Sequence, residues 1–281
     1  MIYARLHGRL GNQMFQYAAA RGLAALRTTG VALDDRTAAH KSEGTLLRVF
    51  DLPLETPPRL PPAKHERLLA YAWWRWFGAN PSFQREIGQG YNTAFAKFPD
   101  NSYLHGYWQS ERYFAHIADD IRAAFTFKTP PSAANQAMAD QISATPSISL
   151  HVRRGDYLNT TAHGVCDQAY YTAALARLLP MIKTDPTVYI FSDDPDWSRN
   201  NLKLGHKTVV VDLNGPTADF EDMRLMSLCQ HHIIANSSFS WWAAWLNNTP
   251  TKQVVAPARW YADKAMQNPD ILPRGWLPVA G

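Results

Sequence analysis

Two arginines stand together with a histidine and an aspartate in the middle of the chain, in the segment HVRRGDY at residues 151–157. Its first two residues end an expected strand at 147–152. Arginine carries a rigid fork of N–H donors that matches phosphate oxygens and stays charged. A surface salt-bridge cluster is the alternative and stabilises a fold little. The carboxyl end of a strand, where α/β proteins bind ligands, favours a functional role for Arg153 and Arg154, which Asp156 could orient.

A glycine-containing segment, GRLGNQ at residues 8–13, lies between an expected strand at 2–6 and an expected helix at 12–27. Glycines at such a turn let backbone N–H groups approach a phosphate, and the helix N-terminus adds partial positive charge. The spacing matches neither G-x-G-x-x-G nor the P-loop. A tight turn that only needs glycine fits equally well.

Two further segments follow expected strands. FSDDPDW at 191–197 contains Asp194 and Asp196, which could chelate a divalent ion as a DxD pair. Capping of the helix that begins at the proline is the interpretation we favour for Asp194, whereas the role of Asp193 stays open. The second segment follows the expected strand at 232–235 and begins with Asn236, which precedes two serines.

Ser237 and Ser238 precede an expected helix at 239–246, where hydroxyl and N–H groups can hold a phosphate and also cap the helix. His231 and His232 are adjacent in an expected strand and point to opposite faces, which is poor geometry for a shared metal.

The elements that must position these residues alternate between strands and helices. Such alternation predicts parallel, doubly wound sheets in two α/β domains, residues 1–140 and 141–281. Regular structure should stop at the proline-rich segment 53–62. Further strands are expected at 31–33, 187–191, 208–212, 232–235 and 253–256, and further helices at 167–182 and 219–230.

Composition excludes several classes of protein. The 281 residues carry a net charge of +4 with a pI near 9.0 and 46% hydrophobic content, which argues against a disordered chain and against a nucleic-acid binder. The two cysteines are too few for a disulfide scaffold. Neither a spanning apolar run nor a signal peptide is evident, so we expect a cytoplasmic protein. Its basic character suits phosphate-bearing ligands or peripheral contact with the inner membrane.

Ten tryptophans are the unusual entry in the composition. The run YAWWRWF at 71–77 is explained by core packing or a partner surface, or by a sugar platform or membrane-facing patch. Trp241, Trp242 and Trp245 belong to the expected helix at 239–246 and should be core.

Taken in order, the segments GRLGNQMFQYA, HVRRGDY, FSDD and MSLCQHHIIANSSFSWWAAWL resemble the α-1,2-fucosyltransferases of glycosyltransferase family 11. The resemblance spans nearly the whole chain, except that residues 50–98 carry no matching motif. It implies an α/β fold of GT-B type, with two Rossmann-like domains facing a cleft. It also implies an inverting transfer of L-fucose from GDP-L-fucose to the 2-hydroxyl of a galactose-like acceptor, without a metal or other cofactor, in surface polysaccharide (O-antigen) synthesis.

By motif position, the resemblance makes Arg153 the pyrophosphate-binding arginine. It places His151 and Asp222 near the guanosine, and Gly11 and Asn12 along the cleft from the first domain. The donor set implied by these motifs comprises Gly11, His151, Arg153, Arg154, Asp193, Asp222, Asn236, Ser237, Ser238 and Phe239, and the catalytic set comprises Arg153, Asp156 and Asn12.

Inversion asks for a base near the acceptor hydroxyl. Asp156, His163 on the acceptor side, and Asp34 and Asp35 at the end of the second strand are candidates, and the sequence does not choose among them. Two other functions fit parts of the sequence. A metal-dependent glycosyltransferase would use Asp194-x-Asp196 and lose activity in EDTA, and a non-catalytic sugar-binding protein would ignore GDP.

Overall fold

The computed structural model describes residues 1–36, 45–57, 59–78, 80–159 and 164–280, without the side chains of Asp156 and Asn159. The chain forms two compact units. The first comprises Met1–Lys128 with Pro269–Ile271, and the second comprises Thr129–Asn268 with Leu272–Gly281. The domain boundary expected after residue 140 falls within helix α5 (Ala133–Ser143), which packs on helix α8 (Asp219–Leu228) of the second unit.

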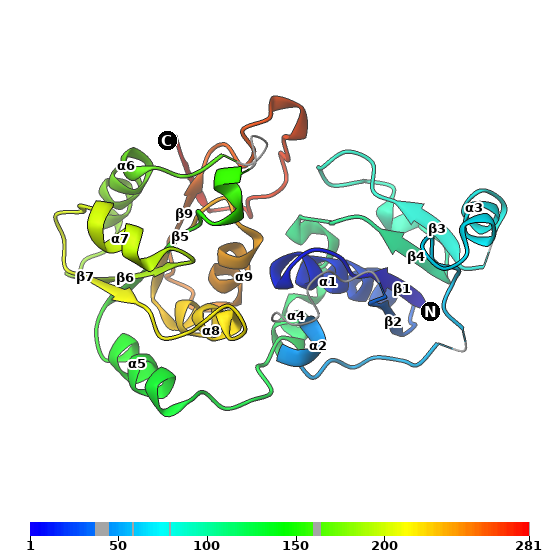
Figure 1. Cartoon of the computed structure of the whole chain (residues 1–281), viewed down its shortest axis with the longest axis horizontal. Coiled ribbons are helices and arrows are strands. Elements are labelled where there is room, and N and C mark those ends of the chain that lie inside the picture. The colour runs from blue at the N-terminus through cyan, green and yellow to red at the C-terminus, as the bar shows by residue number, and fades with distance from the viewer. Residues whose placement is uncertain (37–44, 58, 79, 160–163, 281) are drawn as a thin grey trace. The chain divides into compact units, whose positions relative to one another are not determined.

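The first unit is built on a four-stranded parallel sheet in the order β2-β1-β4-β3. Its strands are β1 (Ile2–Arg5), β2 (Val31–Asp34), β3 (Ser82–Arg85) and β4 (Ser102–His105), and its helices are α1 (Leu10–Leu26), α2 (Leu46–Val49), α3 (Leu68–Phe77) and α4 (Ala118–Ala124) (Figure 1). The chain passes from β1 outward to β2 and then returns to the other side of β1. The order of connection therefore reverses between β1 and β4, which is where α/β sheets bind ligands.

Helix α1 is buried along almost its whole length, because alanine, leucine and aromatic side chains cover all of its sides. It begins directly after Gly8, whose φ of +75° lies in the left-handed region that favours glycine. The helix packs on β1 and β2 and thereby fixes the loop that leads into it.

The opposite side of this sheet carries an aromatic cluster. Tyr71 and Trp74 of α3 pack with Tyr3 and Tyr103 of the sheet, and Phe83 lies against them. The indole Nε1 of Trp74 donates to the carbonyl of Pro81 at 2.9 Å, so the buried ring also has its polar group satisfied.

The second unit contains a six-stranded parallel sheet in the order β10-β9-β8-β5-β6-β7. The chain runs from β5 through β6 to β7 and then crosses to β8 on the other side of β5. This is the doubly wound order, with its switch point between β5 and β8. The strands are β5 (Ser147–Val152), β6 (Thr187–Ser192), β7 (Thr208–Val211), β8 (His231–Ile233), β9 (Val254–Pro257) and β10 (Leu277–Val279).

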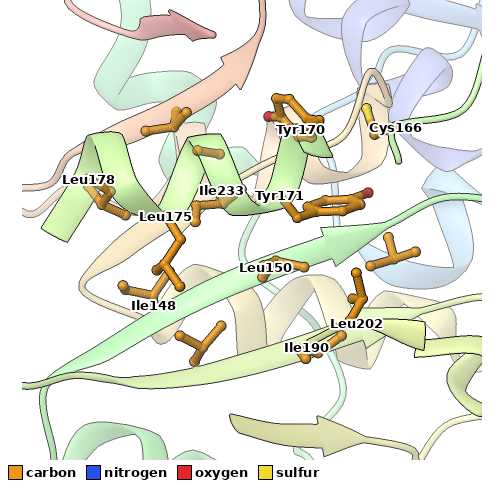
Figure 2. Close-up of a cluster of buried hydrophobic side chains, with 14 of the residues drawn as sticks. Ile148, Leu150, Cys166, Tyr170, Tyr171, Leu175, Leu178, Ile190, Leu202 and Ile233 are labelled. Atoms are coloured by element: carbon orange, nitrogen blue, oxygen red, sulfur yellow. The ribbon is translucent and has the colours of Figure 1, made fainter. Parts of the chain in front are cut away.

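Helix α6 (Gln168–Leu178) covers one face of this sheet (Figure 2). Leu175 and Tyr171 point onto Ile148 and Leu150 of β5, and the fully buried cluster extends to β6, β8 and β9. Side-chain caps start four of the unit's helices: Ser132 for α5, Asp167 for α6, Asp194 for α7 (Pro195–Asn201) and Ser237 for α9 (Ser238–Leu246). Helix α9 packs against α8.

Most elements expected from the sequence are confirmed, with ends that shift by a few residues. Regular structure is absent from the described residues of 53–62, as expected. Helices α2, α3, α4 and α5 and strands β3, β4 and β10 were not predicted. Trp241, Trp242 and Trp245 are buried, as expected for core residues. None of the helices described is long and apolar enough to cross a bilayer.

Candidate active site

The carboxyl ends of β5 and β8 bring the polar motifs of the second unit together. Residues that follow β5 carry the two arginines, and residues that follow β8 carry Asn236 and the two serines. Asp193 follows β6, the neighbour of β5 on the other side. The sequence segments thus meet at the switch point of one sheet, where ligand binding is expected.

Arg153 and Asp193 form an ion pair at this edge. The guanidinium Nη1 lies 3.0 Å from Asp193 Oδ2, and the other carboxylate oxygen accepts from the backbone N–H of Arg154 at 2.9 Å. A Cβ on Gly155 would lie 2.6 Å from Asp193 Oδ2, so glycine lets the loop pass close to this carboxylate. Asp193, whose role the sequence left open, therefore orients Arg153 and its loop.

Arg154 is held in a different way. Its Nε lies 3.3 Å from Asp194 Oδ2, and its guanidinium carbon lies 3.9 Å from the centre of the Trp197 ring. Asp194 also accepts from the N–H of Trp197 at 3.0 Å and so caps α7, as we predicted. These contacts fasten Arg154 to α7, and they distinguish it from Arg153.

His151 is 5% exposed, and its Nδ1 finds no hydrogen-bond partner among the described residues. Its ring lies 5.6 Å from that of Phe239 in α9. Burial, aided by the nearby Arg153, lowers the pKa of His151 to about 3, so the ring stays neutral at physiological pH. A buried polar atom of this kind needs a hydrogen-bond partner from outside the described chain, such as water or a ligand.

The segment between β8 and α9 is held by hydrogen bonds to neighbouring loops and by a helix cap. The side-chain Nδ2 of Asn236 donates to the backbone carbonyl of Trp260 at 3.0 Å, and the backbone carbonyl of Asn236 accepts from Tyr157 Oη at 3.1 Å. Asn236 therefore ties the ends of several loops together. Ser237 caps α9 by accepting from the N–H of Phe239, which confirms capping and leaves Ser238 in the first turn of the helix.

Asp222 lies in the first turn of α8, beside the loop that follows β7. Asn214 donates to its Oδ1 at 2.7 Å and also to Asn135 of α5 at 3.0 Å. Burial raises the pKa of Asp222 to about 7, against the effect of the Asn214 hydrogen bond. Its carboxyl is thus held in one orientation and is poised to change charge near neutral pH.

The two aspartates that could have formed a DxD metal site are engaged in other contacts. Asp194 caps α7 and pairs with Arg154, whereas Asp196 pairs with Arg199 at 2.8 Å. The part of the chain that the structure describes contains no group of three His, Cys, Asp or Glu side chains placed as metal ligands.

The first unit has its own polar cluster at its switch point, after β1 and β4. Asn12 Oδ1 accepts from Gln109 Nε2 at 2.8 Å. Gly8 lies close to the Asn12 amide, and a Cβ built on Gly8 would lie only 2.6 Å from Asn12 Nδ2, so a side chain at position 8 would clash with it. Gly11 is buried in the first turn of α1. Asn12 and Gly11 therefore sit at the start of α1, as expected, and Gln109 is a partner that the sequence did not reveal.

His7 and Tyr107 flank this switch point, with ring centres 4.6 Å apart. Gln16 fixes His7, because its Nε2 donates to the ring Nδ1 at 3.2 Å while its Oε1 accepts from the backbone N–H. Glu86 holds the loop after β4 by accepting from the N–H groups of Tyr107 and Trp108 at 2.6 and 2.8 Å. Neither Tyr107 nor Glu86 was predicted.

The candidate bases have mixed outcomes. Burial alone would raise the pKa of Asp34, but hydrogen bonds from Arg36 and Tyr103 lower it below its usual value. The carboxylate therefore stays charged and is engaged by these two donors. Asp35 is exposed after β2. Asp156 begins a 3-10 turn, and its side chain lies outside the described part of the chain, as does all of His163.

Comparison with known proteins shows similarity over most of the chain. The profile described as Glycosyl transferase family 11 matches residues 84–280. An alpha-1,2-colitosyltransferase of Escherichia coli is 30% identical, over 99% of this chain and 99% of its own. The O-antigen biosynthesis glycosyltransferase WbnK of E. coli is 30% identical over 93% and 95%, respectively. A galactoside alpha-(1,2)-fucosyltransferase 1 of Mus musculus is 28% identical over 85% and 61%.

Solved structures share the fold at low sequence identity. The fucosyltransferase NodZ from Bradyrhizobium has a TM-score of 0.53 at 13% identity, covering 86% of this chain and 92% of its own. Arabidopsis thaliana FUT1 in complex with GDP has a TM-score of 0.56 at 11% identity, covering 98% and 75%. These likenesses confirm the predicted α/β fold of GT-B type.

Proposed function

Because the chain belongs to glycosyl transferase family 11, we propose that this glycosyltransferase moves L-fucose from GDP-L-fucose to the 2-hydroxyl of a galactose-like acceptor, with inversion at the anomeric carbon. The observation that carries the proposal is the convergence of Arg153, His151 and the N-terminus of α9 at one switch point. The mouse relative and WbnK agree with it, since their names describe α-1,2 fucosyl transfer and O-antigen synthesis.

The second unit is the proposed donor side. Breaking the bond between a sugar and GDP leaves negative charge on the β-phosphate, which fixed cations and N–H dipoles can stabilise. Arg153, oriented by Asp193, and the first turn of α9 at Ser238 supply them. His151 and Asp222 are the proposed partners of the guanosine, because each offers an oriented polar atom within a buried setting.

The structure divides the work of the two arginines. Arg153 is the phosphate ligand in this proposal, whereas Arg154 anchors the loop to α7 through Asp194 and Trp197. We propose that catalysis needs no divalent cation, since the aspartates of the DxD pattern already pair with arginines.

The first unit is the proposed acceptor side. Its switch point presents the ring of Tyr107, against which a sugar can stack, beside His7 and the fixed Asn12 amide. For the base that removes the acceptor proton, Asp156 and His163 remain our proposals. The proposed setting is the cytoplasmic face of the inner membrane, during surface polysaccharide synthesis.

Transfer of colitose is the second candidate function, because an alpha-1,2-colitosyltransferase matches the chain from end to end. Colitose is L-fucose without its 3-hydroxyl, so both sugars could use one GDP site. The protein can discriminate between the two donors only through its contacts at the position of that hydroxyl.

A donor and acceptor screen tests the proposal. The purified protein is incubated with GDP-L-fucose, GDP-L-colitose or GDP-mannose and a set of galactosides, and the product linkage and anomeric configuration are assigned by NMR. We expect α-1,2-fucosyl galactosides, formed equally well in EDTA. If only GDP-L-colitose were turned over, colitose transfer and not fucose transfer would be the function. Turnover of GDP-mannose alone would overturn both candidates.

A further inference from the structure

Helix α3 of the first unit carries large apolar side chains both on the side that packs on the sheet and on the side that is exposed. Tyr71 and Trp74 point into the sheet and are buried. The side turned away from the sheet carries Leu68, Leu69, Trp73, Trp76 and Phe77, and we call these five residues the α3 outer face. A surface helix normally places charged or polar residues there, so this helix departs from the ordinary amphipathic pattern.

The α3 outer face is strongly exposed. Leu69 is 85% accessible, Trp76 and Phe77 are each 74% accessible, and Trp73 is 65% accessible. Single exposed apolar residues are normal, but five large ones on a helix of ten residues form a continuous patch. Such a patch marks an interaction surface, because its exposure to water is unfavourable.

The charges around the patch are mostly positive. Arg75 lies on the helix with its guanidinium 5.6 Å from the Trp76 ring centre, and Lys64 and Arg67 are exposed just before the helix. Residues 59–78 contain a single carboxylate, Glu66, which pairs with Arg36 at 3.0 Å. The face is thus apolar in the middle and cationic at its border.

A hollow of about 540 Å³ continues the apolar surface on the side of Trp73. Trp73 and Trp74 form part of its wall together with Pro61 and Pro62. Arg59 also lines it, and so places a further cation beside the tryptophans. The apolar, cation-bordered region therefore extends beyond the helix itself.

We propose that the α3 outer face is a membrane-docking surface that binds an anionic lipid bilayer. Tryptophan, leucine and phenylalanine with neighbouring lysine and arginine are the composition of helices that lie in the bilayer interface. Basic residues near such a surface gain from anionic headgroups, and arginine stems can lie along apolar surface. A second copy of the chain would offer a matching apolar face but no countercharge for Lys64, Arg67 and Arg75.

Vesicle binding tests the proposal on the full chain, without reference to its activity. We expect co-sedimentation with phosphatidylcholine–phosphatidylglycerol vesicles. Binding to vesicles of phosphatidylcholine alone, or to the anionic vesicles at high salt, should be weaker by roughly tenfold or more. Tryptophan fluorescence should shift to the blue on binding and be quenched by brominated acyl chains. A Trp73→Phe/Trp76→Phe variant should lose that signal and still bind, because phenylalanine keeps the apolar surface.

Two variants should weaken binding about tenfold or more. Leu69→Gln/Trp76→Gln removes apolar surface, and Lys64→Glu/Arg67→Glu reverses charge. Their matched controls are Ile87→Gln, which changes an 82% exposed side chain outside α3, and Arg177→Glu/Lys183→Glu, which reverses two exposed charges in the second unit.

Three results would overturn the proposal: equal binding to neutral and anionic vesicles, unchanged binding of Leu69→Gln/Trp76→Gln, or the absence of bromolipid quenching in the wild type. Light scattering tests the alternative that a second copy of the chain binds the α3 outer face, because it measures whether the protein is a dimer. A dimer that Leu69→Gln/Trp76→Gln converts to a monomer would make the face a contact between copies and would also overturn the proposal.

Discussion

At the scale of single residues, adjacent side chains with the same charge have separate surroundings. Arg153 faces Asp193 and the switch point, whereas Arg154 stacks on Trp197 and pairs with Asp194. The sequence grouped both as donor-binding residues, since their identical type and adjacent position gave no reason to separate them. Only the direction of each side chain relative to β6 and α7 reveals the difference.

Substitution of Arg153 should therefore act on catalysis. Arg153→Ala removes the cation proposed to stabilise the leaving β-phosphate, and we expect kcat to fall by about 10²–10³ with an unchanged free energy of unfolding, to within about 1 kcal/mol. Steady-state kinetics with GDP-L-fucose and urea denaturation measure the two effects. Turnover close to that of the wild type would contradict the assigned role.

The neighbouring substitution should act on stability instead. Arg154→Ala loses the contact with the Trp197 ring and the ion pair with Asp194, and we expect the free energy of unfolding to fall by about 1–2 kcal/mol. Its kcat per folded molecule should stay near the wild-type value. A loss of turnover as large as that of Arg153→Ala, at full stability, would show that Arg154 also contacts the donor.

At the scale of elements, the second unit was more predictable than the first. Strands β6 and β9 contain apolar runs, and β5 alternates serine and histidine with isoleucine, leucine and valine; all three are buried on both faces, as is usual in a parallel sheet. Strands β3 and β4 read SFQR and SYLH, short and partly polar, and they gave no comparable signal. Because β4 was missed, Tyr107 and Gln109, which follow it, were missed as site residues.

Helix α3 escaped prediction for a related reason. No side chain caps its N-terminus, and large apolar residues lie on both its buried and its exposed face, so the sequence does not show which face packs on the sheet. The run of tryptophans was evident in the sequence, but its division between core and surface was not. Trp74 is 5% exposed and Trp76 74% exposed, and this follows from the position of the helix on the sheet.

Paired substitutions on α3 test that division. Trp74→Ala removes a ring packed edge-on against Phe83 and Tyr103, together with a hydrogen bond to Pro81, and should lower the free energy of unfolding by about 3–5 kcal/mol. Trp76→Ala on the same helix should change it by less than about 0.5 kcal/mol. Chemical denaturation measures both, and equal losses would contradict the structure of this helix.

At the scale of the whole molecule, each unit carries titratable groups that are partly or fully buried. Burial lowers the pKa of His7 and of His105 to about 4 in the first unit, and that of His151 to about 3 in the second. Burial raises the pKa of Glu86 and of Asp222, one in each unit, to about 7. The two groups of residues affect stability in opposite directions as the pH changes.

The signs follow from proton uptake by the unfolded chain. Unfolded histidines bind protons below pH 6.5 while the native ones stay neutral to about 4 or lower, so acidification favours unfolding. Native Glu86 and Asp222 keep their protons up to about pH 7, whereas unfolded carboxyls release them near 4.5 and 3.8. Their contribution to stability is therefore present in acid and is lost as the pH rises to 7.

The histidines outnumber the carboxyls, so we expect the free energy of unfolding to rise between pH 4.5 and 6.5, by roughly 1 kcal/mol per pH unit after allowance for solvent screening at the partly exposed His105. Urea denaturation at a series of pH values measures this slope. Asp222→Asn removes one opposing carboxyl and should steepen the rise, because the histidines then act against fewer carboxyls whose pKa burial raises, namely Glu86 and Glu221. A flat or falling profile in the wild type, or a shallower one in Asp222→Asn, would show that the buried groups are not held in these protonation states.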